Sequence, residues 1–284
     1  MKKTINKIKK GSKKIAFSPI LENLTRMGYG ARGLIYCIIG LLAIKIALGA
    51  SGSLQDQQGA LASIGQSLFG RILLGIILIG LVGYALWGLT RAFFDPLHKG
   101  KSFKGILERI GFFISAIAYT ILIPPTYNLI FNMPNAAQNG AQGIQIRNII
   151  NTIFSIPLGK WIVGIIGIIV LGISMFQIYK GFSYHFDGQI KQYALSSKQM
   201  KIVKFMGRFG TLARAVVSVL IGVFLLFAAY HSNSLEAKGI DGALSMIMTG
   251  SYGSWLLGIV AIGLITFGCY SLLIGLWFKY KKIT

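Results

Sequence analysis

Six long apolar stretches alternate with shorter polar stretches along the 284-residue chain. They cover approximately residues 29–50, 70–93, 107–131, 158–180, 209–231 and 253–278. A helix needs about 20 mostly apolar residues to cross the hydrocarbon core of a bilayer. Each stretch is too long and too uniformly apolar for a core helix of a soluble protein. The pattern therefore predicts an all-α polytopic membrane protein with six transmembrane helices.

The composition agrees with a membrane protein. Hydrophobic residues make up 54% of the chain and charged residues only 13%, about half the usual share in a soluble domain. There are 29 Lys and Arg residues against 7 Asp and Glu. In a soluble protein this excess would suggest nucleic-acid binding, but in a chain with these apolar stretches we expect the bilayer, and no nucleic acid, as the partner.

The basic residues also predict the orientation, since they concentrate in cytoplasmic loops. Of the 29, 24 lie on the side of the two termini, mostly in the arm 1–20, the second and fourth loops and the tail. Five lie on the other side: Lys45, Arg71, Arg147, Lys160 and Lys238. We therefore expect a multi-pass protein of the bacterial inner membrane with both termini in the cytoplasm. The basic start and the sequence 47–50 faintly resemble a cleaved signal peptide, but the first stretch is long enough to span and its sequence recurs twice, which favours a retained helix.

The odd-numbered spans share a repeated motif, Arg-x-Gly followed by Arg or Ser and a small residue. The repeated positions are Arg26, Gly28 and Arg32 in the first span, Arg109, Gly111 and Ser115 in the third, and Arg208, Gly210 and Arg214 in the fifth. Chance agreement at so many positions is improbable, so the motif indicates an internal triplication. The predicted units are the arm 1–20 and three two-helix repeats, 21–100, 101–188 and 189–284.

The even-numbered spans carry a matching pair of glycines five residues apart. The pairs are Gly70 and Gly75, Gly159 and Gly164, and Gly253 and Gly258. Small residues let helix backbones approach closely in membranes. We therefore predict that these glycines, with Gly28, Gly111 and Gly210, pack helices together; a glycine-lined pore is the alternative.

Three hairpins of the same orientation are related by an axis along the membrane normal. They are compatible with a closed pseudo-threefold ring or with an open arrangement. A closed ring would make the first and sixth spans neighbours and bring Cys37 and Cys269 within cross-linking range. The second hairpin departs most from the pattern, because Pro124-Pro125 should kink its first span and its outer loop, 132–157, is long.

The repeated residues resemble a bacterial membrane family known as domain of unknown function 1206. The similarity is carried by Arg26-Met27-Gly28-Tyr29-Gly30-Ala31-Arg32-Gly33-Leu34-Ile35-Tyr36, by Gly59-Ala60-Leu61, and by Phe69-Gly70-Arg71 through Gly80-Leu81-Val82-Gly83-Tyr84-Ala85-Leu86-Trp87 to Arg91-Ala92-Phe93-Phe94-Asp95. The family also has three two-helix repeats, so the resemblance implies this fold over nearly the whole chain. It implies no biochemical activity.

Charged residues in membrane spans are functional candidates. In a ring, Arg26, Arg109 and Arg208 would form a basic collar, with Arg32 and Arg214 deeper in the membrane. Such a collar favours an anion: a lipid phosphate, a small anionic metabolite or an inorganic anion. Snorkelling arginines that only mark the topology are the alternative. Asp95 and Glu108 are candidate ion-pair partners of these arginines, and exposed pairing within the loop is equally compatible with the sequence.

No enzyme motif is visible, and no Asp, Glu or His lies centrally in a predicted span. His98, His185 and His231 fall in loops on different sides, so they cannot form one metal site. We expect neither catalysis nor a cofactor. The leading hypothesis is a non-enzymatic membrane protein that binds anionic lipid or a partner protein; the alternatives are a channel or carrier for a small solute along the pseudo-threefold axis, and an enzyme acting on a lipid.

Overall fold

The computed structural model describes residues 19–95, 100, 102–131, 141–182 and 196–277. Six helices in these ranges are long and apolar enough to cross a membrane, which confirms the predicted number of spans. They are Glu22–Ala47, Leu68–Phe94, Gly105–Phe131, Gly159–Phe182, Ser197–His231 and Gly253–Trp277. Most of the predicted basic arm, most of the fourth loop, the tail, and the loop residues His98 and His185 lie outside the described residues.

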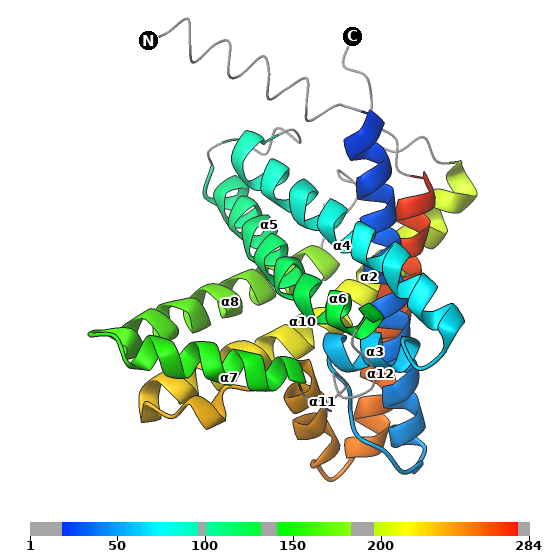
Figure 1. Ribbon diagram of the computed structural model, residues 1–284. Helices are drawn as coiled ribbons and strands as arrows, with labels where there is room; N and C mark the ends of the chain where they lie inside the picture. The colour runs from blue at the N-terminus through cyan, green and yellow to red at the C-terminus, as the bar shows by residue number, and fades with distance from the viewer. Residues whose placement is uncertain (1–18, 96–99, 101, 132–140, 183–195, 278–284) are drawn as a thin grey trace, which may run out of the picture.

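Each hairpin consists of an outgoing span, a short helix and a returning span (Figure 1). The first contains α2 (Pro19–Ala47), α3 (Gln57–Ile64) and α4 (Leu68–Phe94). The third contains α10 (Ser197–His231), a turn of 3-10 helix η2 (Ser234–Glu236), α11 (Ile240–Met248) and α12 (Gly253–Trp277). The span of α10 begins before the predicted residue 209, because Ser196 and Gln199 form a capping box that starts the helix there.

The second hairpin has a broken outgoing span, as the two prolines predict. Its helix α5 (Phe103–Ile121) stops before Leu122, and α6 (Ile123–Phe131) continues the span. Proline has no N–H to donate to the helix; the hydroxyl and the N–H of Thr126 both donate to the Leu122 carbonyl. The hairpin then contains α7 (Ala141–Phe154) and α8 (Gly159–Phe182). Much of the predicted outer loop is therefore helical.

The six spans form an incomplete ring. Helix α2 packs between α4 and α12, α10 packs between α12 and α8, and α4 packs against α5. Helices α5 and α8 touch at only a few positions, although they belong to one hairpin. We call the end where α2 begins and α12 ends the basic end, and the opposite end, where α3, α7 and α11 lie, the far end; the basic end is at the top of Figure 1.

The first repeated glycine sets how closely the two helices of each hairpin approach. A Cβ atom placed on Gly28 would lie 2.6 Å from the Cβ atom of Tyr84, and one on Gly210 would lie 2.5 Å from the Cα atom of Phe267. Gly111 holds the same position in the second repeat, where the nearest atom to an added Cβ is Cγ2 of Ile173, at 3.7 Å. The first and third hairpins therefore pack backbone to backbone, and the second does not.

The glycines of the returning spans have different roles. Gly70, Gly159 and Gly253 each begin a span so close to the preceding short helix that an added Cβ would lie 1.8 to 1.9 Å from a carbonyl oxygen. The close contact of these three glycines is therefore with the preceding short helix and not with another span. Among the described residues, no atom lies within 4 Å of a Cβ built on Gly75 or Gly258, and Gly164 has only an ordinary contact with Ala229, at 3.6 Å. The prediction that these second glycines pack helices tightly is therefore wrong within one protomer, because they lie on faces that no neighbouring helix covers closely.

A tight seam between α2 and α12 joins the first hairpin to the third. Cβ atoms on Gly33 and Gly268 would each lie within 3 Å of the opposite backbone. In the same seam, the Sγ atoms of Cys37 and Cys269 are 4.0 Å apart. The first and sixth spans are thus neighbours, as a ring requires.

The buried apolar residues form two clusters. The larger is shared by the first and third hairpins and by α5 and α6, with Trp87, Leu81 and Leu257 among its fully buried residues. At the far end it includes Leu61 of α3 and Leu244 of α11, both with no exposed surface. A smaller cluster joins α7, α8 and the far end of α10 around Val163, in the arm that projects to the left in Figure 1.

Candidate functional site: a buried arginine–aromatic cluster

Two of the repeated arginines hold helix ends together at the basic end. Arg26 donates from Nε to the Gly275 carbonyl (3.1 Å) and from Nη2 to the Leu276 carbonyl (2.7 Å). In the same way, Arg109 donates to the carbonyls of Ala92 (2.8 Å) and Phe93 (3.2 Å). The last carbonyls of a helix lack hydrogen-bond donors within the helix, and the guanidinium group of the arginine supplies these donors.

These contacts repeat around the molecule. Arg26 of the first repeat binds the end of α12, and Arg109 of the second repeat binds the end of α4. Arg208 holds the equivalent position on α10. The guanidinium groups of Arg26 and Arg109 thus fasten the first repeat to the third and the second repeat to the first, and the anion collar stays a prediction.

The two deeper repeated arginines, Arg32 and Arg214, lie together inside the bundle. Both guanidinium groups lie over the ring of Phe267, each 4.9 Å from its centroid. Arg32 also lies 5.0 Å from the centroid of the Tyr84 ring and donates to the Tyr84 hydroxyl. A third guanidinium, that of Arg91, lies 5.7 Å from the centroid of the Tyr84 ring. Arg91, Tyr84, Arg32, Phe267 and Arg214 thus form a connected group, which we call the arginine–aromatic cluster.

The two aromatic rings of the cluster are equivalent by repeat. Tyr84 follows Gly70 by the same number of residues as Phe267 follows Gly253. They are also the residues onto which Gly28 and Gly210 pack. The close approach of the helices therefore places each ring next to an arginine. In the second repeat the equivalent residue is Ile173, which offers no π face to a cation.

The hydrogen-bond partners that the described residues offer to Arg32 and Arg214 are neutral. Arg32 donates to the hydroxyls of Tyr84 and Ser271, and Arg214 donates from Nη2 to the side-chain oxygen of Gln177, at 2.6 Å. Nε and Nη2 of Arg91 and Nε of Arg214 are buried with no hydrogen-bond partner among the described residues.

Three cations close together in a low-dielectric interior repel one another, and burying them costs free energy unless a negative charge compensates them. Arg32 and Arg91 are each 7% exposed. Cation–π contacts offset part of this cost but leave donors unused. The cluster thus has the charge and the free N–H groups to bind an anion.

The predicted acidic partners lie elsewhere. The ion pair that the structure describes for Glu108 is with Lys180 Nζ, at 2.7 Å, and it joins α5 to α8. Asp95 ends α4 and accepts a hydrogen bond from the N–H of Gly100 at 2.9 Å. The contacts that the structure describes for these two carboxylates are thus with a lysine and with the loop backbone.

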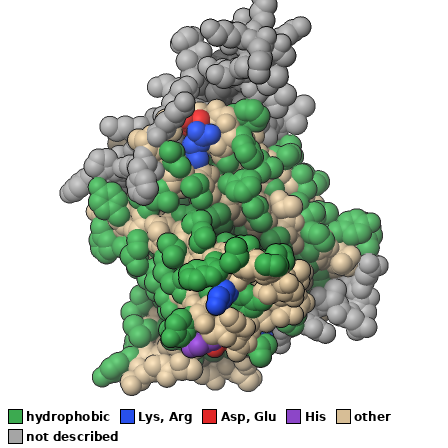
Figure 2. All heavy atoms as spheres, turned by 90° about the vertical axis from the view of Figure 1, so that its left-hand side faces the viewer, with side chains coloured by type: hydrophobic (Ala, Val, Ile, Leu, Met, Phe, Trp, Pro, Cys, Tyr) green, Lys and Arg blue, Asp and Glu red, His purple; other side chains and the backbone are tan. Residues whose placement is uncertain are grey.

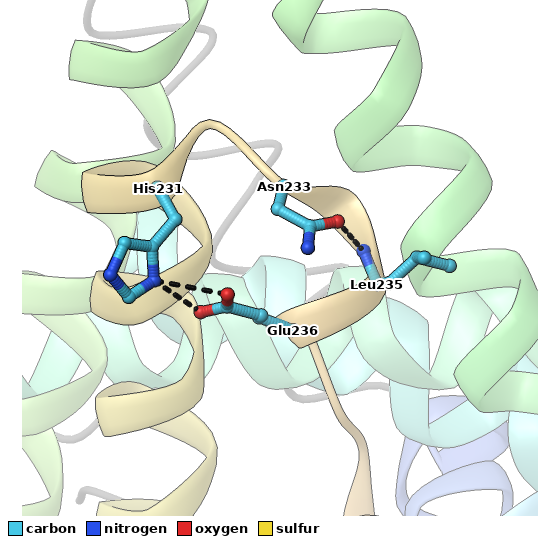
Figure 3. A network of polar contacts seen from close by, with 4 residues as sticks. All are labelled: His231, Asn233, Leu235 and Glu236. Carbon is cyan, nitrogen blue, oxygen red and sulfur yellow. Dashed lines mark hydrogen bonds and ion pairs between the residues drawn. The ribbon is translucent and has the colours of Figure 1, made fainter.

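Other polar groups do not assemble into a second site of this kind. Among the described residues there is no group of three His, Cys, Asp or Glu side chains that could hold a metal ion. His231 lies at the end of α10, with Nδ1 2.8 Å from Oε2 of the nearby Glu236 and its ring next to those of Phe227 and Tyr230. Asn233 accepts a hydrogen bond from the N–H of Leu235 (Figure 3). The contacts of His231 and Asn233 order the turn after α10.

A shallow pocket of about 410 Å³ opens at the far end. Its lining residues are Ile46, Gly52, Ser53, Leu54, Asp241, Ser245 and Met248. The one charged residue among them is acidic, so the pocket lacks the cations that would attract the predicted anionic ligand.

Sequence reasoning identified two of the three arginines in the cluster. It missed Arg91, which was counted only as a marker of topology, and it missed the aromatic residues. A signal was available: Arg91 and Lys180 occupy the same repeat position, each 21 residues after the first glycine of its returning span. Only the structure shows that Arg91 turns inward, over Tyr84, Trp87 and Phe112.

Comparison with known proteins agrees with the repeat architecture. An uncharacterized protein YxxB from Bacillus subtilis (strain 168) is 31% identical over 273 residues, which cover 96% of this chain and 95% of that protein. No solved structure is significantly similar. The model of the family described as Domain of Unknown Function (DUF1206) matches three times, at residues 27–95, 110–183 and 209–277, once in each hairpin. The chain is therefore a member of the DUF1206 family of membrane proteins.

Proposed function

We propose that this protein is a non-enzymatic membrane protein that binds an oxyanion of the phosphate type at the arginine–aromatic cluster. The observation that carries the proposal is a group of three guanidinium groups, two of them buried and one part-buried, for which the described residues supply neutral hydrogen-bond partners or none. Guanidinium groups bind phosphate oxygens with short, charge-assisted hydrogen bonds. In the orientation that the basic residues favour, the cluster lies in the cytoplasmic half of the bacterial inner membrane.

The packing favours binding over conduction. A channel along the pseudo-threefold axis would need a polar path from the cluster to the far end. Beyond the cluster, the buried core is mostly apolar, and Leu61 and Leu244 have no exposed surface at the far end. The buried polar side chains there, among them Asp56, Gln57 and Gln58, belong to the start of α3. This supports an anion that is held at the cluster rather than passed across the membrane.

Thermal unfolding of the detergent-purified protein tests the proposal. Inorganic phosphate, compared with chloride at equal ionic strength, should raise the melting temperature by several degrees, since a ligand at 100 times its Kd stabilises by about 2.7 kcal/mol. Arg91→Gln should abolish this rise. Arg71→Gln, at the other end of the same helix, is the matched control and should preserve it.

Two results would reject the proposal. One is a melting temperature that does not respond to phosphate at any concentration. The other is an equal response in Arg91→Gln and Arg71→Gln, which would place the anion somewhere other than the cluster.

A further inference from the structure

The helix pairs around the arginine–aromatic cluster differ in how tightly they close it. The glycine backbones at Gly28, Gly210 and Gly268 seal the pairs α2–α4, α10–α12 and α2–α12. The junction between α5 and α8 has no such seal, because an added Cβ on Gly111 would still lie 3.7 Å from the nearest atom of Ile173. This junction is the weak point in the wall around the cluster.

The cluster lies directly behind this junction. The guanidinium of Arg91 lies 4.1 Å from the centroid of the Phe112 ring on α5, one residue from Gly111. On the other side, Arg214 bonds Gln177 of α8, one helical turn from Ile173. Arg91 and Arg214 thus each contact one helix of the α5–α8 junction, and each has a buried N–H donor without a hydrogen-bond partner among the described residues.

The outer surface at this junction is suited to lipid. Only 22% of residues in the span of α5 and α6, and 17% in that of α8, are buried within the protein, against 44% to 50% for α2, α4 and α12. Their exposed side chains are mostly large and apolar, including Ile110, Phe113 and Ile117 on α5 and Ile168 and Met175 on α8. Figure 2 shows that this side of the molecule is largely hydrophobic with few charges. An acyl chain can lie against such a surface, whereas a free hydrated ion gains nothing from it.

We propose, building on the proposed function, that the bound oxyanion is the headgroup phosphate of an anionic phospholipid that reaches the arginine–aromatic cluster sideways, between α5 and α8. Charge complementarity selects the headgroup, and the apolar faces of α5 and α8 hold the acyl chains. The ion pair between Glu108 and Lys180 bridges the two helices at the basic end of the junction. The route therefore requires α5 and α8 to separate there.

The first experiment compares ligands that share acyl chains or share the phosphate. The melting temperature of the purified protein is measured with dioleoyl-phosphatidylglycerol, with dioleoyl-phosphatidylcholine and with inorganic phosphate. Phosphatidylglycerol should stabilise most, and its binding, counted by native mass spectrometry, should be at least about tenfold weaker in Arg91→Gln, since a hydrogen bond to a charged group is worth that much.

The second experiment links α5 to α8 by a disulfide, so that the two helices cannot separate. In a Cys37→Ser/Cys269→Ser background, Gly111→Cys and Ile173→Cys place two thiols across α5 and α8. Their disulfide should abolish the extra stabilisation by phosphatidylglycerol, and dithiothreitol should restore it. The matched control is the unaltered chain, in which oxidation of Cys37 and Cys269 pins the closed α2–α12 seam and should leave lipid binding unchanged.

The outcomes separate the two proposals. If phosphate stabilises but phosphatidylglycerol does no more than phosphatidylcholine, the anion site stands and the lipid proposal is overturned. If phosphatidylglycerol binds equally well to the pinned protein, the sideways route is overturned. If neither ligand has any effect, both proposals fail. If pinning changes the oligomeric mass instead of lipid binding, the junction is an interface between copies of the chain, which also overturns the lipid proposal.

Discussion

The second and third hairpins are repeats of the same helix arrangement, but the two spans of the third pack closely together and those of the second do not. In the third, Gly210 lies against the backbone of Phe267, and in the second, Gly111 faces only the end of the Ile173 side chain. The spans follow this difference, since half of the α12 span but only 17% of the α8 span is buried. A glycine permits close approach but does not enforce it. The residue opposite the glycine, and the helices that follow, decide whether the hairpin closes.

The cause of the difference lies partly in the outgoing span. Pro124 and Pro125 break the third span, and its second part, α6, packs mainly with α4. Helix α8 is drawn instead toward α10, where Gly167 and Gly222 face Leu226 and Leu171. The second hairpin thus packs more with its two neighbours than within itself, which leaves a loose junction beside the three arginines of the cluster.

The largest expected effect comes from adding a single methyl group at the repeated glycine. Gly210→Ala would place a Cβ atom 2.5 Å from the Phe267 backbone and should destabilise the protein by about 3 kcal/mol, the upper range for overpacking. Gly111→Ala, with 3.7 Å of room, should not destabilise the protein and should stabilise it by up to about 1 kcal/mol, the helix propensity that alanine gains over glycine. Unfolding in detergent micelles measures both. Equal losses at the two positions would show that the second hairpin closes as tightly as the third.

A smaller effect is expected from the arginine forks that join the repeats. Arg26→Met removes two hydrogen bonds to the end of α12 and should cost about 1–2 kcal/mol, discounted for partial exposure. Arg26→Lys keeps the charge but cannot reach both carbonyls in the same way, so it should recover less than half of the loss. Hydrogen exchange at residues 272–277 should rise in Arg26→Met. Unchanged exchange there would mean that the fork contributes nothing to the helix end.

The close contact between α2 and α12, which joins the first hairpin to the third, leads to a qualitative prediction. Because the Sγ atoms of Cys37 and Cys269 lie 4.0 Å apart, mild oxidation in membranes should join them within one chain. Peptide mass spectrometry after digestion detects the linked pair. Failure to form this disulfide under conditions that oxidise accessible control thiols would contradict a ring that is closed between α2 and α12.

The spans and their repeats were predictable because they depend on local properties of the chain. Hydrophobic length sets a span, and residues such as Arg26, Gly28, Arg109 and Gly111 recur at fixed spacing. The break at Pro124-Pro125 was equally local, since it follows from the missing N–H groups.

The partners of the repeated residues were not predictable in the same way. The same Arg-x-Gly motif places Arg26 on a helix end and Arg32 in the interior, and spacing alone does not distinguish an arginine that binds carbonyls from one that lacks a counter-ion. Arg91 joined the cluster only because the Gly28–Tyr84 approach brings α4 against α2. The loose α5–α8 junction likewise depends on competition among neighbouring helices, which no single repeat encodes.

The third hairpin is closed and the second is loose, although both have the same order of helices. Pulsed electron paramagnetic resonance with matched spin labels tests this difference most directly. Ile117 and Ile165 in the second repeat correspond in position to Val216 and Ile259 in the third, and all four are between 42% and 57% exposed. With both native cysteines replaced by serine, each pair is labelled in turn and its separation is measured. The account predicts that the 117–165 separation exceeds the 216–259 separation by about 5 Å or more, half a helix diameter. Equal separations would contradict it.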